Sequence, residues 1–351
     1  MTTTGADRTV GCLRGIAVGD AIGKQTENLA PGDVARWYPE GVRGFEGTPD
    51  TVIPRYRGNT KHEWRFGETT DDTERTIAVA RAIIADRAVS HSSVGREMLR
   101  CTKCVHPGVK SLWQFHEAHD PTRIDDVHDG CGAAIRVAPV GILWAPDCID
   151  DLVTGAYEAS VSTHGAPVAI AAAAANAAAV SAAVDGASGP EIQEFALAAA
   201  SSAEARWPID SSKPSIAHAI RRVHKALMSL PTLRASEIAS RCFPDHTSRI
   251  VPLGLALATL MESADEAIIV AANVGGDSDS VASIAGGILG ARYPDSVKRS
   301  WYEIAERVNG LDLLALACAL VPLRQRCSAL SYQSLSGPWA TLVPTTPTGS
   351  A

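Results

Sequence analysis

The sequence has few cysteines and no apolar segment at its N-terminus. Its 351 residues include 8 cysteines, far fewer than a disulfide-stabilised domain uses. The first residues, MTTTGADRTVG, lack the apolar core of a signal peptide, so we expect a cytoplasmic protein. Cys101 and Cys104 form the single C-x-x-C pair, and the sequence therefore gives no support to a four-cysteine zinc site.

Basic residues are also in the minority. The chain has 32 Lys and Arg against 39 Asp and Glu, which gives a net charge of −7. Because nucleic acid attracts positively charged proteins, we expect no general nucleic-acid binding. The hydrophobic fraction of 46% is sufficient for a sizeable core, and we expect a monomer.

Long apolar runs are absent with one exception, PVAIAAAAANAAAVSAAV at residues 167–184. This run is long enough to be considered as a membrane span. Alanine is only weakly hydrophobic, however, and the run contains Asn176 and Ser181. We therefore expect a central helix that its neighbours approach closely, and no membrane association.

The sequence pattern that is present over most of the chain is the spacing of apolar residues typical of α-helices. Apolar residues recur every three to four positions in the stretches 72–88, 167–184, 190–206, 214–228 and 251–262, and alternating stretches are few. The sequence thus predicts an all-α fold, a compact bundle in one domain over residues 1–327. Residues 41–66 are rich in Gly and Pro and predict a long loop, and the Ser, Thr and Pro of 328–351 predict a flexible tail.

Two adjacent carboxylates open one of these helices. In FGETTDDTERTIAVA, residues 66–80, Asp71 and Asp72 follow Thr70 and precede an apolar run. Asp and Thr at a helix start satisfy free N–H groups and the helix dipole, so capping alone accounts for them. A second acidic cluster would require another explanation.

Such a cluster exists in AANVGGDSDSVASIAGGILGA, residues 271–291. Asp277 and Asp279 follow a Gly-Gly turn and precede a helix of small residues. An EF-hand calcium loop is excluded, because its sixth position would be Ala282 and its twelfth Ile288. Carboxylate and hydroxyl oxygens without sulfur or imidazole suit Mg²⁺, Mn²⁺ or Ca²⁺ better than zinc. So many carboxylates are better neutralised by two ions, about 3.5–4 Å apart, than by one.

Several ordered blocks of the chain resemble the signature blocks of the ADP-ribosylglycohydrolase family. They are GCLRGIAVGDAIGKQTE (11–27), TTDDTE (69–74), DGCGAAIRVAPVG (129–141), STHGAP (162–167) and GGDSDSVASIAGGILGA (275–291). The resemblance implies an all-α domain with two divalent cations, Mg²⁺ or Mn²⁺, that cleaves the bond between ADP-ribose and an acceptor. By position it implies these metal ligands: Thr70, Asp71, Asp72, Asp277, Asp279 and Ser280. Ser278 and Ser280 stand where the family commonly has threonine, and Ser280 keeps the ligating hydroxyl.

The resemblance also implies catalytic and ligand-binding residues. Glu27, Asp72 and Asp279 are the catalytic candidates, although Glu27 read alone is equally a surface glutamate. The implied ADP-ribose contacts are Asp129, Gly130, Cys131, Gly132, Ala133, His164, Gly275 and Gly276. Glycines permit close backbone approach to phosphate or ribose, whereas Cys131 stands where asparagine is frequent. His164 is otherwise a capping or core residue, and Arg136 pairs either with a phosphate or within a structural ion pair.

The function expected is hydrolysis at C1″ of ADP-ribose, which releases it from a modified protein, nucleic acid or small conjugate. Two alternatives stay open: an ADP-ribose binder that has lost catalysis, and a two-metal hydrolase of another nucleotide sugar. The acceptor is also open among arginine N, serine O, a nucleic-acid base and a terminal phosphate. The loop 41–66, with Arg43, Arg55 and Arg57, is expected to help select it, unless those arginines are ordinary solvated charges.

Overall fold

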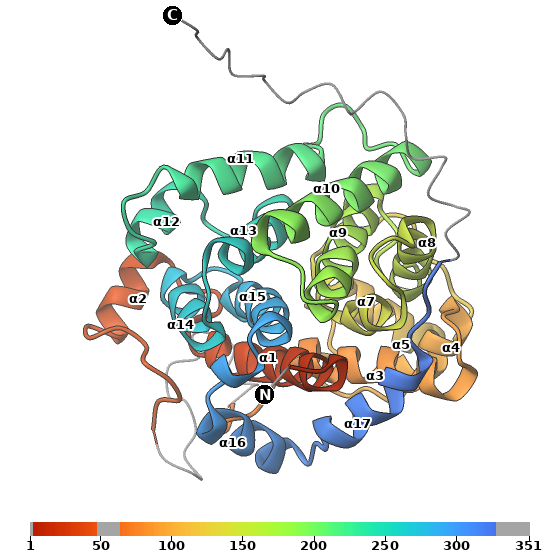
Figure 1. Cartoon of the computed structure of the whole chain (residues 1–351), viewed down its shortest axis with the longest axis horizontal. Coiled ribbons are helices and arrows are strands. Elements are labelled where there is room, and N and C mark those ends of the chain that lie inside the picture. The colour runs from red at the N-terminus through yellow and green to blue at the C-terminus, as the bar shows by residue number, and fades with distance from the viewer. Residues whose placement is uncertain (1–2, 48–63, 328–351) are drawn as a thin grey trace, which may run out of the picture.

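The computed structural model describes residues 3–47 and 64–327, and these are built from helices (Figure 1). Within those ranges no strand forms; one isolated bridge pairs Trp144 with Gln325. The all-α prediction is confirmed. Each of the five predicted helices overlaps an observed one, namely α3, α9, α10, α11 and α13.

The helices of the first half run from the N-terminus to the alanine-rich segment. They are α1 (Gly5–Gly23), the 3₁₀ turn η1 (Lys24–Thr26), α2 (Pro31–Trp37), α3 (Asp71–Asp86), α4 (His91–Met98), α5 (Lys110–Ala118), α6 (Gly132–Arg136), α7 (Ala138–Leu143), α8 (Ile149–Ser160) and α9 (Pro167–Val184). The second half contains α10 (Gly189–Arg206), α11 (Ile216–Met228), α12 (Ala235–Arg241), α13 (Thr247–Leu260), α14 (Ala264–Val274), α15 (Ser278–Arg292), η2 (Pro294–Ser296), α16 (Arg299–Asn309), α17 (Leu313–Leu320) and η3 (Val321–Leu323).

Helix α9 is the apolar run singled out by the sequence. By length and composition it is able to cross a membrane, yet 94% of it is buried inside the molecule, against α7, α8 and α10. Its polar residues find partners there, because Asn176 donates to Ala134 O at 2.6 Å and Ser181 donates to Trp144 O. The predicted central helix is present, and the absence of membrane association stays a prediction.

Helices α1 and α15 lie antiparallel at the centre of the molecule (Figure 1) and touch through a stripe of glycines. The stripe on α1 comprises Gly11, Gly15, Gly19 and Gly23. A Cβ atom on Gly15 would lie 2.0 Å from Gly286 O of α15, and one on Gly19 would lie 2.3 Å from Ala282 O. The four-residue spacing places these glycines on one face of α1. The two backbones therefore approach closely, and the end of α1 is held against the start of α15.

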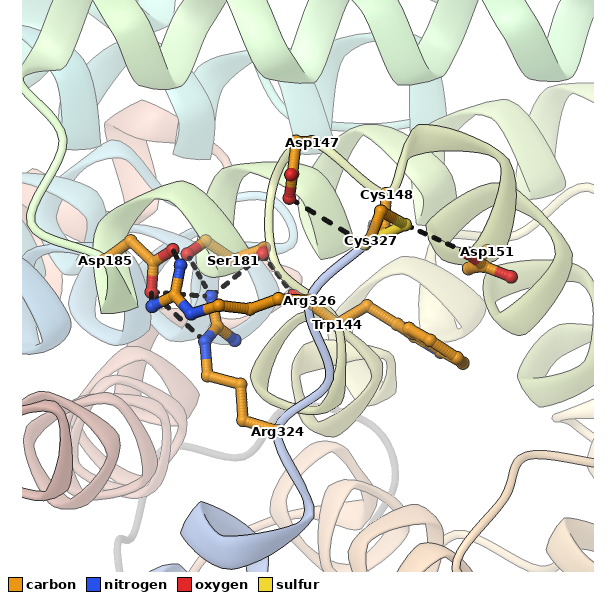
Figure 2. Close-up of a disulfide and its surroundings, with 9 residues drawn as sticks. All are labelled: Trp144, Asp147, Cys148, Asp151, Ser181, Asp185, Arg324, Arg326 and Cys327. Carbon is orange, nitrogen blue, oxygen red and sulfur yellow. Dashed lines mark hydrogen bonds and ion pairs between the residues drawn. A yellow bond between two sulfur atoms is a disulfide. The ribbon is translucent and has the colours of Figure 1, made fainter. Parts of the chain in front are cut away.

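A C-terminal strap, residues 321–327, crosses α7 and the end of α9 (Figure 2). Arg324 donates to Gly141 O at 2.9 Å and Ile142 O at 2.7 Å, and pairs with Asp185 at 3.0 Å. A disulfide between Cys148, at the start of α8, and Cys327 fastens the end of the strap. The sequence analysis did not predict this pair, because 179 residues separate the two cysteines and no spacing pattern marks them.

Some expectations concern residues outside the described ranges. Most of the predicted loop 41–66, with Arg55 and Arg57, and the tail 328–351 fall there. Arg43 is described: it is exposed and pairs with Glu40 at 3.1 Å, as an ordinary solvated charge does.

Candidate functional site

The two acidic helix starts predicted from the sequence meet in the structure. Helix α3 begins behind Thr70, whose hydroxyl accepts the N–H of Asp72 at 3.1 Å and so caps the helix. Asp277 precedes α15 but makes no side-chain capping bond. Across 208 positions of sequence, Ser280 Oγ donates to Asp72 Oδ2 at 3.1 Å. Capping by Thr70 therefore does not occupy the carboxylates of Asp71, Asp72 and Asp277, of which Asp71 pairs with Arg75 at 3.4 Å.

A double-glycine turn places the start of α15. Gly275 and Gly276 have φ values of +79° and +67°, a region that side chains disfavour. The N–H of Gly276 donates to Leu29 O at 2.9 Å, and that of Asn28 donates to Gly276 O at 2.8 Å. A Cβ atom on Gly275 would lie 2.4 Å from Leu29 O. These glycines bring Asp277 beside the segment that follows η1.

Asp20, on α1, supports the start of α3 from beneath. Its fully buried carboxylate accepts the N–H of Thr70 at 2.9 Å, and the N–H and hydroxyl of Thr73 at 3.1 and 2.5 Å. Burial raises the pKa of Asp20, and hydrogen bonds from Thr73 and Thr70 oppose the shift. Sequence reasoning missed this residue, although a carboxylate in the apolar, glycine-rich second half of α1 was a visible signal.

Burial and like charge characterise two further carboxylates, those of Asp72 and Asp279. Burial, followed by the charges of Asp71, Asp20 and Asp277, raises the pKa of Asp72 well above its usual value. Burial likewise raises the pKa of Asp279, although Lys24 opposes the shift. Carboxylates crowded in this way are stabilised by a divalent cation, and their oxygens suit Mg²⁺ or Mn²⁺. The donor set therefore fits the expected metals.

The tightest group of potential ligand atoms in the described residues is not at the acidic cluster. Among the described His, Cys, Asp and Glu residues, one group places three ligand atoms within 4.8 Å of one another: Cys148, Asp151 and Cys327. Two of its sulfur atoms form the disulfide, which makes that group a poor metal site. Among the described residues, no three carboxylates of the α3 and α15 starts come within that distance of one another.

Lys24 and Glu27 lie at the side of the cluster formed by η1. The Lys24 ammonium is bonded to Glu27 and lies 3.9 Å from Asp279 Oδ2 and 4.6 Å from the centre of the Trp64 ring. Glu27 is only 20% exposed, so the structure places it beside the cluster and not on the open surface. The sequence analysis had not singled out Lys24, although it follows the glycine stripe directly.

The predicted ADP-ribose loop joins the cluster through Cys131. Its Sγ donates to Asp277 Oδ2 at 3.0 Å and lies 3.8 Å from Ser280 Oγ. Burial and the charge of Asp277 raise the pKa of this thiol well above its usual value, which keeps the proton that makes the bond. Asp129 lies further out, where its carboxylate pairs with Lys213 at 2.7 Å. Ala133 is completely buried in the core, so this predicted contact is not exposed to a ligand in this structure.

His164 packs against the glycines of that loop. A Cβ atom on Gly130 would lie 3.1 Å from His164 Nε2, and one on Gly132 would lie 3.4 Å from His164 Cε1. Burial, with Arg136 next, lowers the pKa of His164 well below its usual value, so the ring is neutral near pH 7. Arg136 is itself completely buried and donates to Ala159 O, Ser160 O and Thr163 Oγ1, each at 2.8 Å. Arg136 therefore has a structural role, through hydrogen bonds and not through an ion pair.

An open cavity of about 270 Å³ adjoins the carboxylates. It is lined by Glu27, Asn28, Phe243, Pro244, Asp245, Gly276 and Asp277. The sequence did not predict Asn28, Phe243 or Asp245, and no motif marks them. A larger cavity of about 510 Å³, lined in part by Arg14, Arg299 and Tyr302, contains none of the predicted site residues. We place the site at the smaller cavity, because that is where the groups able to perform chemistry lie.

Comparisons with known proteins agree with the blocks recognised in the sequence. The family model described as ADP-ribosylglycohydrolase matches residues 1–329. The uncharacterized protein YegU of Escherichia coli K12 is 27% identical over 340 residues, which are 92% of this chain and 99% of YegU. An uncharacterized protein of Archaeoglobus fulgidus is 27% identical over 317 residues, 87% of this chain and 93% of the relative.

Two further relatives carry functional names. The ADP-ribosyl-[dinitrogen reductase] glycohydrolase of Rhodospirillum rubrum is 26% identical over 145 residues, 39% of this chain and 44% of that enzyme. A solved structure named as an ADP-ribosylglycohydrolase-related protein complex superposes with a TM-score of 0.67 at 24% identity. It covers 92% of this chain and 99% of its own, and it shows a shared fold.

Proposed function

The chain belongs to the ADP-ribosylglycohydrolase family, and we propose that it is a divalent-metal-dependent hydrolase that cleaves the bond at C1″ of ADP-ribose and releases it from a modified acceptor. Family membership supports hydrolase activity of the glycohydrolase type in general. The metal requirement and the acceptor are parts of the proposal, as are the cytoplasmic location and the monomeric state expected from the sequence.

The meeting of the two acidic helix starts beside a cavity carries the proposal. Asp72 and Ser280 are in contact at 3.1 Å, and Asp277 lines the cavity as well as bordering the cluster. The proposed metal ligands are Thr70, Asp71, Asp72, Asp277, Asp279 and Ser280. When bound there, two Mg²⁺ or Mn²⁺ ions would supply positive charge that orients ribose hydroxyls and a water and stabilises the breaking bond.

The residues of the chain have separate tasks in this scheme. The backbone at Gly130 and Gly132 admits the ligand closely, and the neutral His164 supports that loop from behind. Phe243 offers an aromatic wall to the cavity. Asp72 and Asp279 orient the reacting end, where an oxocarbenium-like state is expected as the bond breaks. Glu27, at the edge of the same cavity, is the proposed group for proton transfer to or from the water.

Metal dependence and acceptor class are tested by one comparison. Free ADP-ribose is measured after incubation with ADP-ribosylated protein, ADP-ribosylated nucleic acid and a small O-linked conjugate, each with Mg²⁺, with Mn²⁺ and with chelator. We expect release from at least one substrate that chelator abolishes and that Asp277→Ala also abolishes. Near-normal release in metal-depleted buffer contradicts the metal assignment. Binding of ADP-ribose without release from any substrate favours the non-catalytic alternative. If another nucleotide sugar, incubated under the same conditions, is the sole substrate hydrolysed, the alternative of a two-metal hydrolase with a different substrate is favoured.

The role of Glu27 has a test of its own. We expect Glu27→Gln to lower turnover by ~10²–10⁴-fold, because proton transfer contributes in the transition state. The ADP-ribose dissociation constant should change by much less, since glutamine has the same size. Steady-state kinetics and titration calorimetry with ADP-ribose measure the two effects. Equal losses in both would indicate a binding role.

A further inference from the structure

A lysine ammonium lies inside the carboxylate cluster. Lys24 is only 5% exposed. Its ammonium pairs with Glu27, lies 3.9 Å from Asp279 Oδ2 and lies over the face of the Trp64 ring. Lysine is almost never buried unless its charge is paired. The position is set by the backbone, since Lys24 directly follows the α1 glycine that packs on Asp279 Cα. The chain thus builds a fixed cation into one side of the cluster.

On the other side of the cluster, Arg75 pairs with Asp71 at 3.4 Å, but Asp72 and Asp277 have no such cation among the described residues. Asp72 is hydrogen-bonded to Ser280, and Asp277 to Cys131. Within residues 3–47 and 64–327, no lysine or arginine nitrogen lies within 4 Å of the carboxylate of Asp72 or Asp277. The cluster is therefore electrostatically uneven, with a resident cation beside Glu27 and Asp279 and uncompensated charge beside Asp72 and Asp277.

We propose that Lys24 occupies one of the two cation positions of this site in the resting protein, so that divalent ions bind unequally and in order. The inference rests on the proposed metal site. The first ion binds beside Asp72, Asp277 and Ser280. The second binds only after the ammonium leaves Glu27 and Asp279, and the same displacement frees Glu27 from its lysine partner.

The competition has a measurable cost for the second ion. When a resident group occupies a binding position, an incoming ion can bind only during the fraction of time that the position is free. Its apparent dissociation constant is the intrinsic constant divided by that fraction. Two like-sign cations a few ångströms apart also repel each other strongly in a partly buried site. We therefore expect the second ion to bind about tenfold or more weakly than the first.

The test measures Mn²⁺ binding to metal-stripped parent protein, Lys24→Met and Lys24→Gln by titration calorimetry, and by electron paramagnetic resonance of free and paired Mn²⁺. The parent should show one tight ion and one that is weaker by about tenfold or more. In both Lys24 variants the second ion should tighten toward the first, and the signal of coupled Mn²⁺ pairs should appear at lower metal concentration. Circular dichroism checks that the variants are folded, and equal affinities in the parent would overturn the proposal without them.

Lys103 offers a matched control. Its ammonium also lies over the Trp64 ring, at 5.6 Å, but it contacts Thr69, Glu68 and Asn309 instead of the cluster carboxylates. Lys103→Met should therefore leave the inequality unchanged. Two ions of equal affinity in the parent, an unchanged second ion in the Lys24 variants, or an equal effect of Lys103→Met each overturns the proposal about Lys24 alone. No Mn²⁺ binding in any of the proteins overturns the proposed metal-dependent function as well.

Discussion

Asp72 has two possible roles at the start of α3, and one substitution separates them. We expect Asp72→Asn to leave the metal-free protein as stable as the parent or more stable, because Thr70 still caps the helix and one buried like charge is gone. A ligand at a hundredfold excess over its Kd stabilises the folded protein by about 2.7 kcal/mol. Excess Mn²⁺ should therefore raise the unfolding temperature of the parent. The variant should lose most of that response. Thermal unfolding with chelator and with Mn²⁺ measures both effects. If Mn²⁺ shifts the unfolding temperature of the parent and of the variant equally, Asp72 acts only at the start of the helix and does not bind metal.

Asp125 is expected to make the stability of the segment before the ADP-ribose loop depend on pH. Burial opposes its ionisation, but hydrogen bonds from His128 and from the N–H groups of His128 and Val127 outweigh it and lower the pKa of Asp125. A lowered folded-state pKa contributes stability above the unfolded value of ~3.9, and that contribution is lost as pH falls through the folded value.

The variant that tests this is Asp125→Asn. At pH 7 we expect it to be less stable than the parent by about 1–3 kcal/mol, because hydrogen bonds to a charged group are lost. The difference should begin to shrink below pH ~4 and continue to shrink as pH falls through the lowered folded-state pKa of Asp125, where the parent also loses the charge. Urea unfolding at several pH values measures it. A difference that is the same at pH 3 and pH 7 would contradict the charge-based explanation.

At the scale of helices, the sequence predicted the elements better than their contacts. The five predicted helices were recognised because their apolar residues recur at helical spacing, and the two acidic starts because they carry unusual side chains. The approach of α1 to α15 was not predicted, although Gly11, Gly15, Gly19 and Gly23 recur every four residues. Small residues indicate that something packs closely, and they do not indicate which partner does.

The partners at the site were harder to predict for the same reason. The site gains Lys24 beside Asp279, and Asn28 and Phe243 in the wall of the cavity beside Asp277. These residues come together only because α1, η1 and the segment before α13 converge in space. Nothing in the local sequence marks Asn28 or Phe243, and Lys24 is marked only by its place directly after the glycine stripe. The Cys148–Cys327 pair likewise depends on where the strap ends, which is a property of the packed molecule.

The glycine stripe predicts a large difference between two similar substitutions in α1. Gly15→Ala would place a Cβ atom 2.0 Å from Gly286 O, so the helices must separate, at a cost of about 1–3 kcal/mol or more. Gly5→Ala, in the first turn of the same helix, meets nothing within 4 Å and should be neutral or stabilise by about 0.4–1 kcal/mol. Denaturant unfolding compares them. Equal stabilities of the two variants would show that α1 and α15 tolerate separation.

At the scale of the whole molecule, the disulfide ties the C-terminal strap to the start of α8. A cross-link over a long loop typically stabilises a protein by about 2–4 kcal/mol. We expect reductant to lower the unfolding temperature of the parent, and Cys327→Ser to have the lowered value with or without reductant. Cys318→Ser, which removes an exposed free thiol in α17, should behave like the parent. A parent that melts at one temperature in both buffers would contradict a stabilising role for the cross-link.

The pairing of α1 with α15 also has a consequence for biosynthesis. Ser283 of α15 bonds to Ile16 of α1 across 267 residues. At about 5–20 residues per second, α1 leaves the ribosome roughly 13–53 s before the helix that covers its glycine face is complete. During that interval the glycine face of α1 lacks its native cover, although earlier helices such as α3 and α9 can already contact α1, and the acidic cluster has only its α3 half. Any nascent or truncated chain that ends before Asp277 should therefore be a client for chaperones and unable to retain a metal ion.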